Sequence, residues 1–205
     1  DEVKTYIEQN LPRFLADNQR FYFNGTIKEL MDSEEGTQTL FGVAIVFIYL
    51  ILAAQFESFR DPLLILLTVP LCIIGALLSL WLFGQSINIY SKIGLLTLVG
   101  LVTKHGILLV EFANKRQHEG MSELGAIISS VRSRFRPIMM TTITMILGAL
   151  PLALSEGPGS VGRENIGLVL VGGLLSGTLF TLFVIPVAYY AVASIKNDFY
   201  GRFKR

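Results

Sequence analysis

The chain has 205 residues, of which 52% are hydrophobic and 16% are charged, and its formal net charge is +1 at pH 7. Soluble domains carry about 25% charged residues, so this composition favours a membrane protein over a cytosolic one. The near-neutral charge gives no general case for nucleic-acid binding. The single cysteine, Cys72, excludes an internal disulfide and a cysteine metal site.

Residues 1–31 are the most polar part of the chain. Apolar residues at nearly helical spacing predict a helix within residues 1–16, and 21–23 (Phe-Tyr-Phe) before Asn24-Gly25 predicts a short strand that enters a turn. Thirty residues cannot bury a core alone. We therefore expect a short α/β remnant of a larger soluble domain, and a chain that is a fragment of a longer protein.

Five apolar segments follow in residues 32–205, the predicted transmembrane domain. They run at about residues 40–56, 62–83, 89–112, 137–154 and 166–193. A helix needs roughly 17 to 25 residues to cross a bilayer, so all five are long enough, the first only just. Buried helices of a large soluble enzyme are the alternative, which five such segments in succession disfavour. The sequence predicts an all-α membrane protein with five transmembrane helices, the second kinked at Pro70.

Lysine and arginine are unevenly distributed between the connections. Ten of them lie after the first and third segments and in the C-terminal tail: Arg60, Lys115, Arg116, Arg132, Arg134, Arg136, Lys196, Arg202, Lys204 and Arg205. The opposite connections hold only Lys92 and Arg163. The positive-inside rule then predicts a cytoplasmic C-terminus. In a bacterium with two membranes, this is a multi-pass inner-membrane protein whose residues 1–31 are periplasmic.

A separate amphipathic helix is predicted at residues 121–133, between the third and fourth segments. Its apolar residues recur at helical spacing, and Arg132, Arg134 and Arg136 follow at its end. Such a helix lies along the cytoplasmic membrane surface, where the arginines meet lipid phosphates.

The third segment contains one lysine, Lys104, in the stretch Gly100–Phe112 (Gly-Leu-Val-Thr-Lys-His-Gly-Ile-Leu-Leu-Val-Glu-Phe). A charge at this depth costs from about 2.5 to more than 10 kcal/mol unless it is paired or hydrated. We therefore expect Lys104 to face a protein interior or a water-filled cavity and to have a function. Helical spacing places Thr97, Gly100 and Glu111 on the same face.

Two other ionisable residues of this segment have two interpretations each. Glu111 precedes Lys115 by four residues, which favours an ion pair at the membrane interface over a role in a proton relay. His105 points about 100° away from Lys104. It either relays protons or packs against a neighbouring helix, and the second interpretation is favoured.

The fourth segment contains Thr141, Thr142 and Thr144, at positions where leucine would cost less in a membrane. Threonines in such helices often bond back to their own backbone. Thr141 and Thr144 share a face, however, and this pair suggests a polar seam against another helix.

Small residues recur in the fifth segment. Gly173 and Gly177 are four residues apart, as are Gly172 and Ser176. Small residues at this spacing let helix backbones approach closely, so we expect these four to form a packing surface. The sequence contains no nucleophile–base pair, carboxylate cluster or metal-ligand spacing, and its chemistry is therefore not that of an enzyme.

Three stretches closely resemble the resistance-nodulation-division (RND) multidrug efflux pumps, in the hydrophobe/amphiphile exporter subgroup of the AcrB/MexB kind. They are Leu52–Pro62, Gly100–Phe112 and Arg134–Thr142, and the resemblance extends from about Phe23 to Ile195. It implies that the five segments are the eighth to twelfth helices of a twelve-helix protomer. It also implies that residues 1–31 are the end of the second periplasmic porter region.

The same resemblance implies a proton site. In the family, two adjacent aspartates on the fourth helix meet a lysine and a threonine, which fall by motif on Lys104 and Thr141, and Arg134 matches an arginine linked to proton passage. The aspartates belong to the half of the protomer that this sequence does not include. His105 stands where the family commonly has asparagine. No cofactor is implied, and the proton gradient is the energy source.

We therefore expect the C-terminal membrane portion of a drug/proton antiporter that exports xenobiotics, including antibiotics. The resemblance also implies its partners: the N-terminal portion of the same protomer, two further protomers in a homotrimer, a periplasmic adaptor, an outer-membrane channel and membrane lipids. Two alternatives stay open. One is a scaffold subunit that transports nothing, and the other is a family member that exports lipids or proteins.

Overall fold

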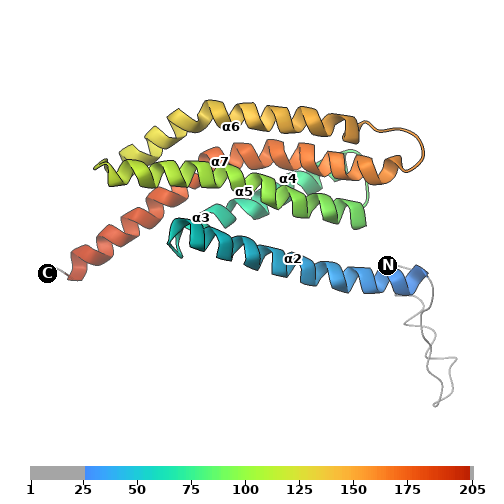
Figure 1. Ribbon diagram of the computed structural model, residues 1–205, viewed down its shortest axis with the longest axis horizontal. Coiled ribbons are helices and arrows are strands. Elements are labelled where there is room, and N and C mark those ends of the chain that lie inside the picture. The colour runs from blue at the N-terminus through green and yellow to red at the C-terminus, as the bar shows by residue number, and fades with distance from the viewer. Residues whose placement is uncertain (1–25, 204–205) are drawn as a thin grey trace, which may run out of the picture. The chain divides into compact units, whose positions relative to one another are not determined.

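The computed structural model describes the backbone of residues 26–203 and the side chains of residues 39–191. The chain divides into two compact units, Asp1–Thr39 and Leu40–Arg205. All regular structure in the described residues is helical (Figure 1). The strand expected at residues 21–23 and the helix expected within residues 1–16 lie outside the described residues.

Six helices make up the described part of the chain: α2 (Thr26–Phe56), α3 (Asp61–Leu66), α4 (Thr68–Leu82), α5 (Ile89–His118), α6 (Glu123–Ala153) and α7 (Ser160–Phe203). Five stretches of them are long and apolar enough to cross a membrane: Thr39–Phe56, Asp61–Leu82, Ile89–His118, Glu123–Ala153 and Ser160–Ala191. The prediction of five such helices is therefore confirmed for the described residues.

The second stretch is divided at Leu67 into α3 and α4. Pro70 has no N–H to bond the carbonyl of Leu66, and its ring crowds that carbonyl. The expected kink at Pro70 therefore appears as a break three residues earlier. By contrast, Pro137, Pro151 and Pro186 lie inside continuous helices.

Residues 123–133 of the amphipathic helix expected at residues 121–133 are helical, and they are continuous with the rest of α6 instead of forming a separate helix. The helix begins after Ser122, whose side chain accepts a hydrogen bond from the N–H of Gly125, and it continues through Pro137. One face of this part packs against α5: Ile127 is buried, and the hydroxyl of Ser130 donates to the carbonyl of Leu109 at 2.6 Å. This packing against α5 supports the helix across the proline.

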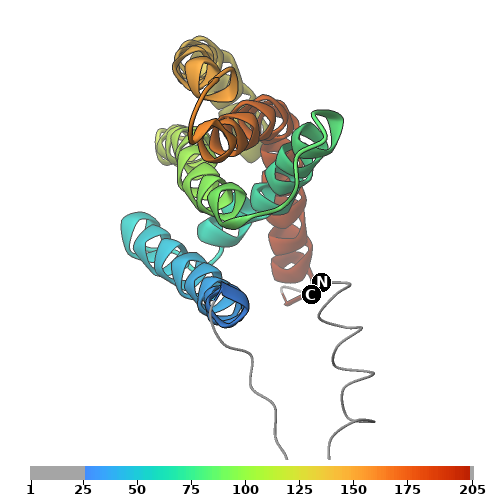
Figure 2. The ribbon, with the colours of Figure 1, turned by 90° about the vertical axis from the view of Figure 1, so that its right-hand side faces the viewer.

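Helix α7 lies at the centre of the second unit and packs against α4, α5 and α6 (Figure 2). Two clusters of buried apolar side chains fill the space around it. One includes Leu52, Ile65, Leu109, Ile138 and Ile185. The other includes Cys72, Leu80, Leu98, Val169 and Leu174.

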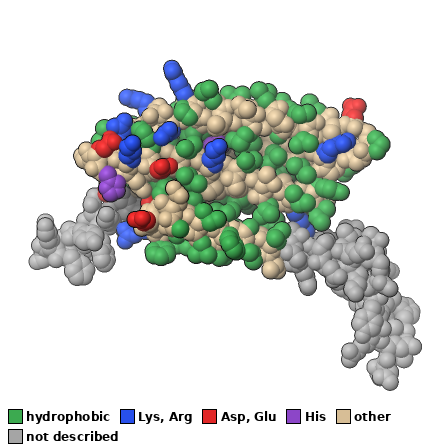
Figure 3. Space-filling model, viewed as in Figure 1, with side chains coloured by type: hydrophobic (Ala, Val, Ile, Leu, Met, Phe, Trp, Pro, Cys, Tyr) green, Lys and Arg blue, Asp and Glu red, His purple; other side chains and the backbone are tan. Residues whose placement is uncertain are grey.

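The connections lie at two opposite ends of the unit. The α4–α5 and α6–α7 connections lie at one end, which we call the 84–88 end, and the α2–α3 and α5–α6 connections lie at the other, the 119–122 end (Figure 1). Most of the Lys and Arg side chains visible in Figure 3 gather at the 119–122 end.

Candidate functional site

Lys104 projects from the face of α5 that the other described helices leave uncovered. Thr97, Gly100, Lys104 and Glu111 are all exposed, at the three- and four-residue spacing of a single helix face. We call this set the open face of α5. Leu98, on another side of the helix, is completely buried. A methyl group built on Gly100 would meet nothing within 4 Å among the described residues.

Within the described part of the chain, no side chain forms a hydrogen bond or an ion pair with Lys104. Glu111 and Lys115 are both exposed and do not form the expected ion pair there. An exposed pair of this kind contributes only about 0–1 kcal/mol, so little favours one fixed geometry. The open face therefore carries a cation and a carboxylate, neither of which has a fixed partner among the described side chains.

The expected polar seam of Thr141 and Thr144 is not formed among the described helices. Thr141 Oγ1 lies 3.1 Å from the carbonyl oxygen of Pro137 and 3.0 Å from that of Ile138. Thr144 Oγ1 donates to the carbonyl of Met140 at 2.8 Å. Both hydroxyls are therefore bonded to their own helix, as threonines in membrane helices often are.

Thr142 is the threonine of α6 that meets other helices. Its Oγ1 lies 3.1 Å from Thr178 Oγ1 of α7 and 3.5 Å from His105 Nε2 of α5, and all three side chains are buried. We call these three residues the His–Thr–Thr junction. His105 accordingly packs between helices, with its Nδ1 buried and without a hydrogen-bond partner in the described residues.

Arg134 lies near the 119–122 end and contacts an aromatic ring of α5. Its Cζ is 4.8 Å from the ring centre of Phe112, and Cζ of Arg116 is 5.0 Å from the same centre. Arg116 also forms an ion pair with Glu119 at 3.0 Å. Guanidinium groups at this distance are attracted to the face of an aromatic ring. Phe112 therefore holds Arg134 of α6 against α5, while Arg116 of α5 contacts the same ring.

A second polar cluster joins three helices near the same end. Asn114 Nδ2 of α5 donates to Asp61 Oδ2 of α3 at 2.8 Å, and the hydroxyl of Tyr189 in α7 donates to Asn114 Oδ1 at 2.6 Å. The sequence analysis did not identify this cluster. The position of Asp61, next to Pro62 in the first turn of a helix, is the one sequence signal that points to it.

The small residues of α7 lie against α4 and α5. A methyl group built on Gly172 would overlap Ser79, and one on Gly173 would overlap Leu98. One on Gly177 would lie 2.8 Å from Cys72 Cβ. Ser176 lies against Gly75 of α4. The hydroxyl of Ser79 also donates to the carbonyl of Leu168 at 2.7 Å, which ties α4 directly to the backbone of α7.

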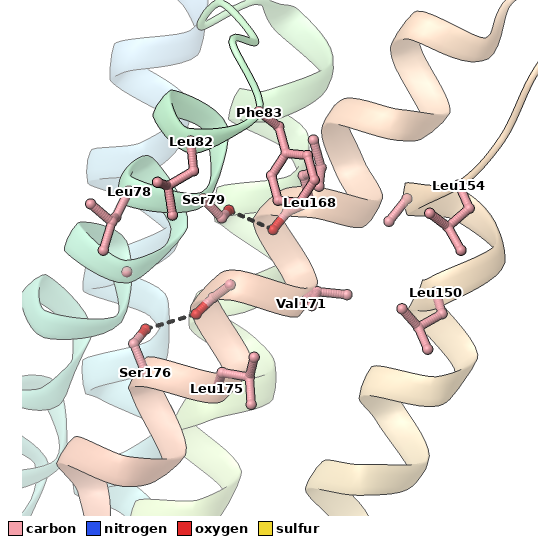
Figure 4. A pocket seen from close by; sticks show the side chains of 13 residues that line it. Leu78, Ser79, Leu82, Phe83, Leu150, Leu154, Leu168, Val171, Leu175 and Ser176 are labelled. Carbon is pink, nitrogen blue, oxygen red and sulfur yellow. Dashed lines mark hydrogen bonds between the residues drawn. The ribbon is translucent and has the colours of Figure 1, made fainter.

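A cavity of about 360 Å³ opens between α4, α6 and α7 (Figure 4). Leucine side chains such as Leu78, Leu150 and Leu175 line it, with two hydroxyls, those of Ser79 and Ser176. Both hydroxyls are bonded to backbone carbonyls, Ser176 to Gly172 at 2.9 Å. The wall of this cavity therefore presents apolar surface, without a charged group.

Among the described residues, no three His, Cys, Asp or Glu side chains lie close enough together to hold a metal ion. The polar groups described above are a cation on an open helix face, a buried junction of one histidine and two threonines, and two side-chain clusters near one end. This arrangement offers ionisable and hydrogen-bonding side chains on one open helix face and at the contacts between helices.

Comparison with known proteins gives a consistent result. The AcrB/AcrD/AcrF family matches residues 1–193 of the chain. The chain is 43% identical over 196 residues to an uncharacterized transporter of Haemophilus influenzae, which covers 92% of the chain and 19% of the relative. It is 39% identical over 175 residues to the toluene efflux pump membrane transporter TtgB of Pseudomonas putida, covering 85% of the chain and 17% of the relative.

A third relative, the multidrug resistance protein MdtF of Escherichia coli, is 39% identical over 174 residues, which cover 84% of the chain and 16% of the relative. The chain therefore spans less than a fifth of the length of each of these relatives.

Proposed function

The chain belongs to the AcrB/AcrD/AcrF family of RND efflux transporters, and from this membership we propose that it forms part of the membrane domain of a proton-driven drug efflux pump. The pump is a secondary transporter in which the proton gradient drives export. This chain supplies the part of the proton relay that lies on α5 and α6.

The observation that carries the proposal is the position of Lys104. It lies in the middle of Ile89–His118, the third stretch able to cross the membrane, and its side chain points away from the packed core. A lysine there costs several kcal/mol in a bilayer unless a carboxylate or water meets it. Such a cost is compatible with a stable protein when the open face is completed by acids from the rest of the protomer.

Three residues of this chain contribute to the proposed relay. Lys104 is the cation that favours the ionised form of nearby carboxylates and loses that contact when they are protonated. Thr141 lies on the neighbouring helix α6 and is half-buried, so its hydroxyl can take part in hydrogen bonding at the same site. Arg134, whose Cζ lies 4.8 Å from the ring centre of Phe112 near the 119–122 end, is the proposed point of proton passage between the relay and the aqueous phase.

Three other residues have lesser roles in this proposal. Thr144 and Glu111 border the relay on α6 and α5, and His105 acts from the buried side of α5. The two aspartates of the family relay come from the N-terminal portion of the same protomer. Family membership also supports a homotrimer that works with a periplasmic adaptor and an outer-membrane channel.

The proposed orientation places the 119–122 end in the cytoplasm. Six basic residues lie near this end among the described residues, namely Arg60, Lys115, Arg116, Arg132, Arg134 and Arg136, against Lys92 and Arg163 near the opposite end. The positive-inside rule supports this orientation in the bacterial inner membrane. Residues 1–31 then belong to a periplasmic porter domain.

The test replaces Lys104 in the whole transporter and measures drug resistance in cells, with membrane levels checked by immunoblot. Lys104→Met keeps the length of the side chain without its charge and should abolish resistance. Lys104→Arg should be badly impaired, because a planar guanidinium does not replace a compact ammonium. Thr141→Ala should do less harm, since one hydroxyl contributes only about 1 kcal/mol as a hydrogen bond.

The matched control is Lys115→Met, which removes a lysine from the same helix near its end, where a charge can reach water. This variant should retain resistance. If Lys104→Met pumps as well as Lys115→Met at equal membrane levels, the relay proposal is wrong and Lys104 is a structural residue.

A further inference from the structure

The hydroxyl of Thr142 has more neighbours than it can donate to, and this limits how the His–Thr–Thr junction is bonded. Its Oγ1 lies 2.9 Å from the carbonyl of Ile138, 3.1 Å from Thr178 Oγ1 and 3.5 Å from His105 Nε2. A hydroxyl donates one hydrogen bond and accepts up to two. A carbonyl oxygen only accepts, so the one proton of Thr142 goes to Ile138.

The remaining two contacts are therefore bonds that Thr142 accepts. We assign Thr178 as the donor to Thr142 at 3.1 Å, and the longer contact at 3.5 Å as a weak hydrogen bond from His105 Nε2–H. The imidazole is then neutral, with the proton on Nε2 and a lone pair on Nδ1. This assignment agrees with the buried position of Nδ1, which has no partner in the described residues. A buried neutral imidazole also avoids the larger cost of a buried charge.

The junction lies next in sequence to both candidate relay residues of this chain. His105 follows Lys104 on α5, and Thr142 follows Thr141 on α6. Consecutive helical residues point about 100° apart. On each helix, one residue therefore points into the junction while its neighbour points toward a more exposed side.

We propose that the His–Thr–Thr junction fixes the register of α5 against α6 and α7, and that His105, Thr142 and Thr178 are positioning residues for the relay formed by Lys104 and Thr141. This inference rests on the proposed function. A slip of one residue moves a helix by 1.5 Å along its axis and turns the contacting side chain by about 100°. Such a slip would break the contact between His105 and Thr142.

The location of the junction supports this role. Val102, one turn before His105, belongs to one apolar cluster, and Leu109, one turn after it, belongs to the other. Both clusters consist mainly of apolar contacts, which are not directional. The junction is the polar contact that joins α5, α6 and α7 between them, and a single buried polar residue is known to specify helix register elsewhere.

The test uses the whole transporter and compares Thr142→Val with Thr142→Ser. Valine keeps the shape of threonine without the hydroxyl, and serine keeps the hydroxyl. Thr142→Val should lower the maximal rate of proton-coupled efflux about ten- to a hundredfold, as misplacement by about 1 Å does in catalytic sites. The drug concentration for half-maximal rate should stay the same. Thr142→Ser should restore most of the rate.

The matched control is Thr103→Val. Thr103 is also a buried threonine, but its hydroxyl donates only to the carbonyl of Val99 in its own helix. This variant should keep the parent rate. If Thr142→Val also keeps it, the junction does not position the relay.

A second measurement is made on the unmodified transporter, and a variant serves only to assign the signal. Nitrogen-15 NMR of histidine-labelled transporter, with His105 assigned from the spectrum of His105→Asn, should show a protonated Nε2 and an unprotonated Nδ1. A protonated Nδ1 would overturn the bonding assignment and the inference with it. The Lys104→Met result separates the two proposals: full activity there refutes the relay, whereas an inactive Lys104→Met beside a fully active Thr142→Val refutes only the junction.

Discussion

The close contact between α4 and α7 allows a quantitative test at Gly75. A methyl group built on Gly75 would overlap the Cβ and Oγ of Ser176, and its next neighbour is the carbonyl oxygen of Gly172 at 3.2 Å. Gly75→Ala therefore forces α4 and α7 apart or moves Ser176. Because the overlap involves one side chain, removing that side chain should relieve it, and Gly75→Ala with Ser176→Gly is the compensating pair.

The magnitude follows from two opposing effects. Alanine in place of glycine favours a helix by about 0.8–1.0 kcal/mol, whereas overpacking of a well-packed contact costs about 1–3 kcal/mol. Gly148→Ala has the first effect without the second, because its methyl group would meet nothing within 4 Å in the described structure. Gly75→Ala should therefore be less stable than Gly148→Ala by about 1–3 kcal/mol.

The assay is unfolding of the purified protein in detergent micelles by titration with SDS, followed by far-UV circular dichroism. In the double-mutant cycle, the variant with both Gly75→Ala and Ser176→Gly should be more stable than the sum of the single changes, by about 0.5–3 kcal/mol. Two results would refute the reasoning. One is equal stability of Gly75→Ala and Gly148→Ala, and the other is a coupling energy of zero.

The remaining predictions concern the 119–122 end and the orientation. In the same unfolding assay, Tyr189→Phe should lower the stability by about 1 kcal/mol, because an asparagine oxygen loses its donor. Tyr190→Phe, at an exposed neighbouring position, should leave the stability unchanged. Equal effects of the two variants would contradict the hydrogen bond of Tyr189. Phe112→Leu should cost about 1–2 kcal/mol, since two guanidinium groups lose contacts of about 0.5–1 kcal/mol each, and an unchanged midpoint would contradict this. Reporter fusions should place Gly120 in the cytoplasm and Gly159 in the periplasm, and the reverse result would overturn the orientation.

The number and approximate positions of the helices could be predicted because a bilayer imposes length and hydropathy on each span. The ends were harder to predict where proline was involved. Pro70 and Pro137 give the same local signal, yet the chain breaks near the first and continues through the second. In the first part of α6, Ser130 donates to the backbone of α5. Local sequence does not contain that contact.

The site shows a similar limit. Periodicity identifies which residues share a helix face, and it placed Lys104 and Gly100 together on α5. It does not identify which face meets a neighbouring helix, and for this reason the polar seam was assigned to Thr141 and Thr144, whereas Thr142 meets α5 and α7. Thr142 and its partner Thr178 are 36 residues apart, and Tyr189 and Asn114 are 75 apart. Pairings at such separations depend on how the helices assemble, which a single sequence does not specify.

The open face of α5 leads to a last prediction, at Gly100. This residue lies one turn before Lys104 on the same face, and the described helices leave room for a side chain there. If the rest of the protomer packs against this face to bring acids to Lys104, a large side chain at Gly100 obstructs that packing. Gly100→Leu should therefore leave the stability of this 205-residue chain against unfolding unchanged, or raise it slightly. In the whole transporter it should abolish drug resistance, and Gly100→Ala should have a smaller effect because its methyl group is small. Equal resistance in all three proteins, at equal membrane levels, would mean that the face of Lys104 meets lipid, and a lysine facing lipid cannot serve as a relay with acids on another helix.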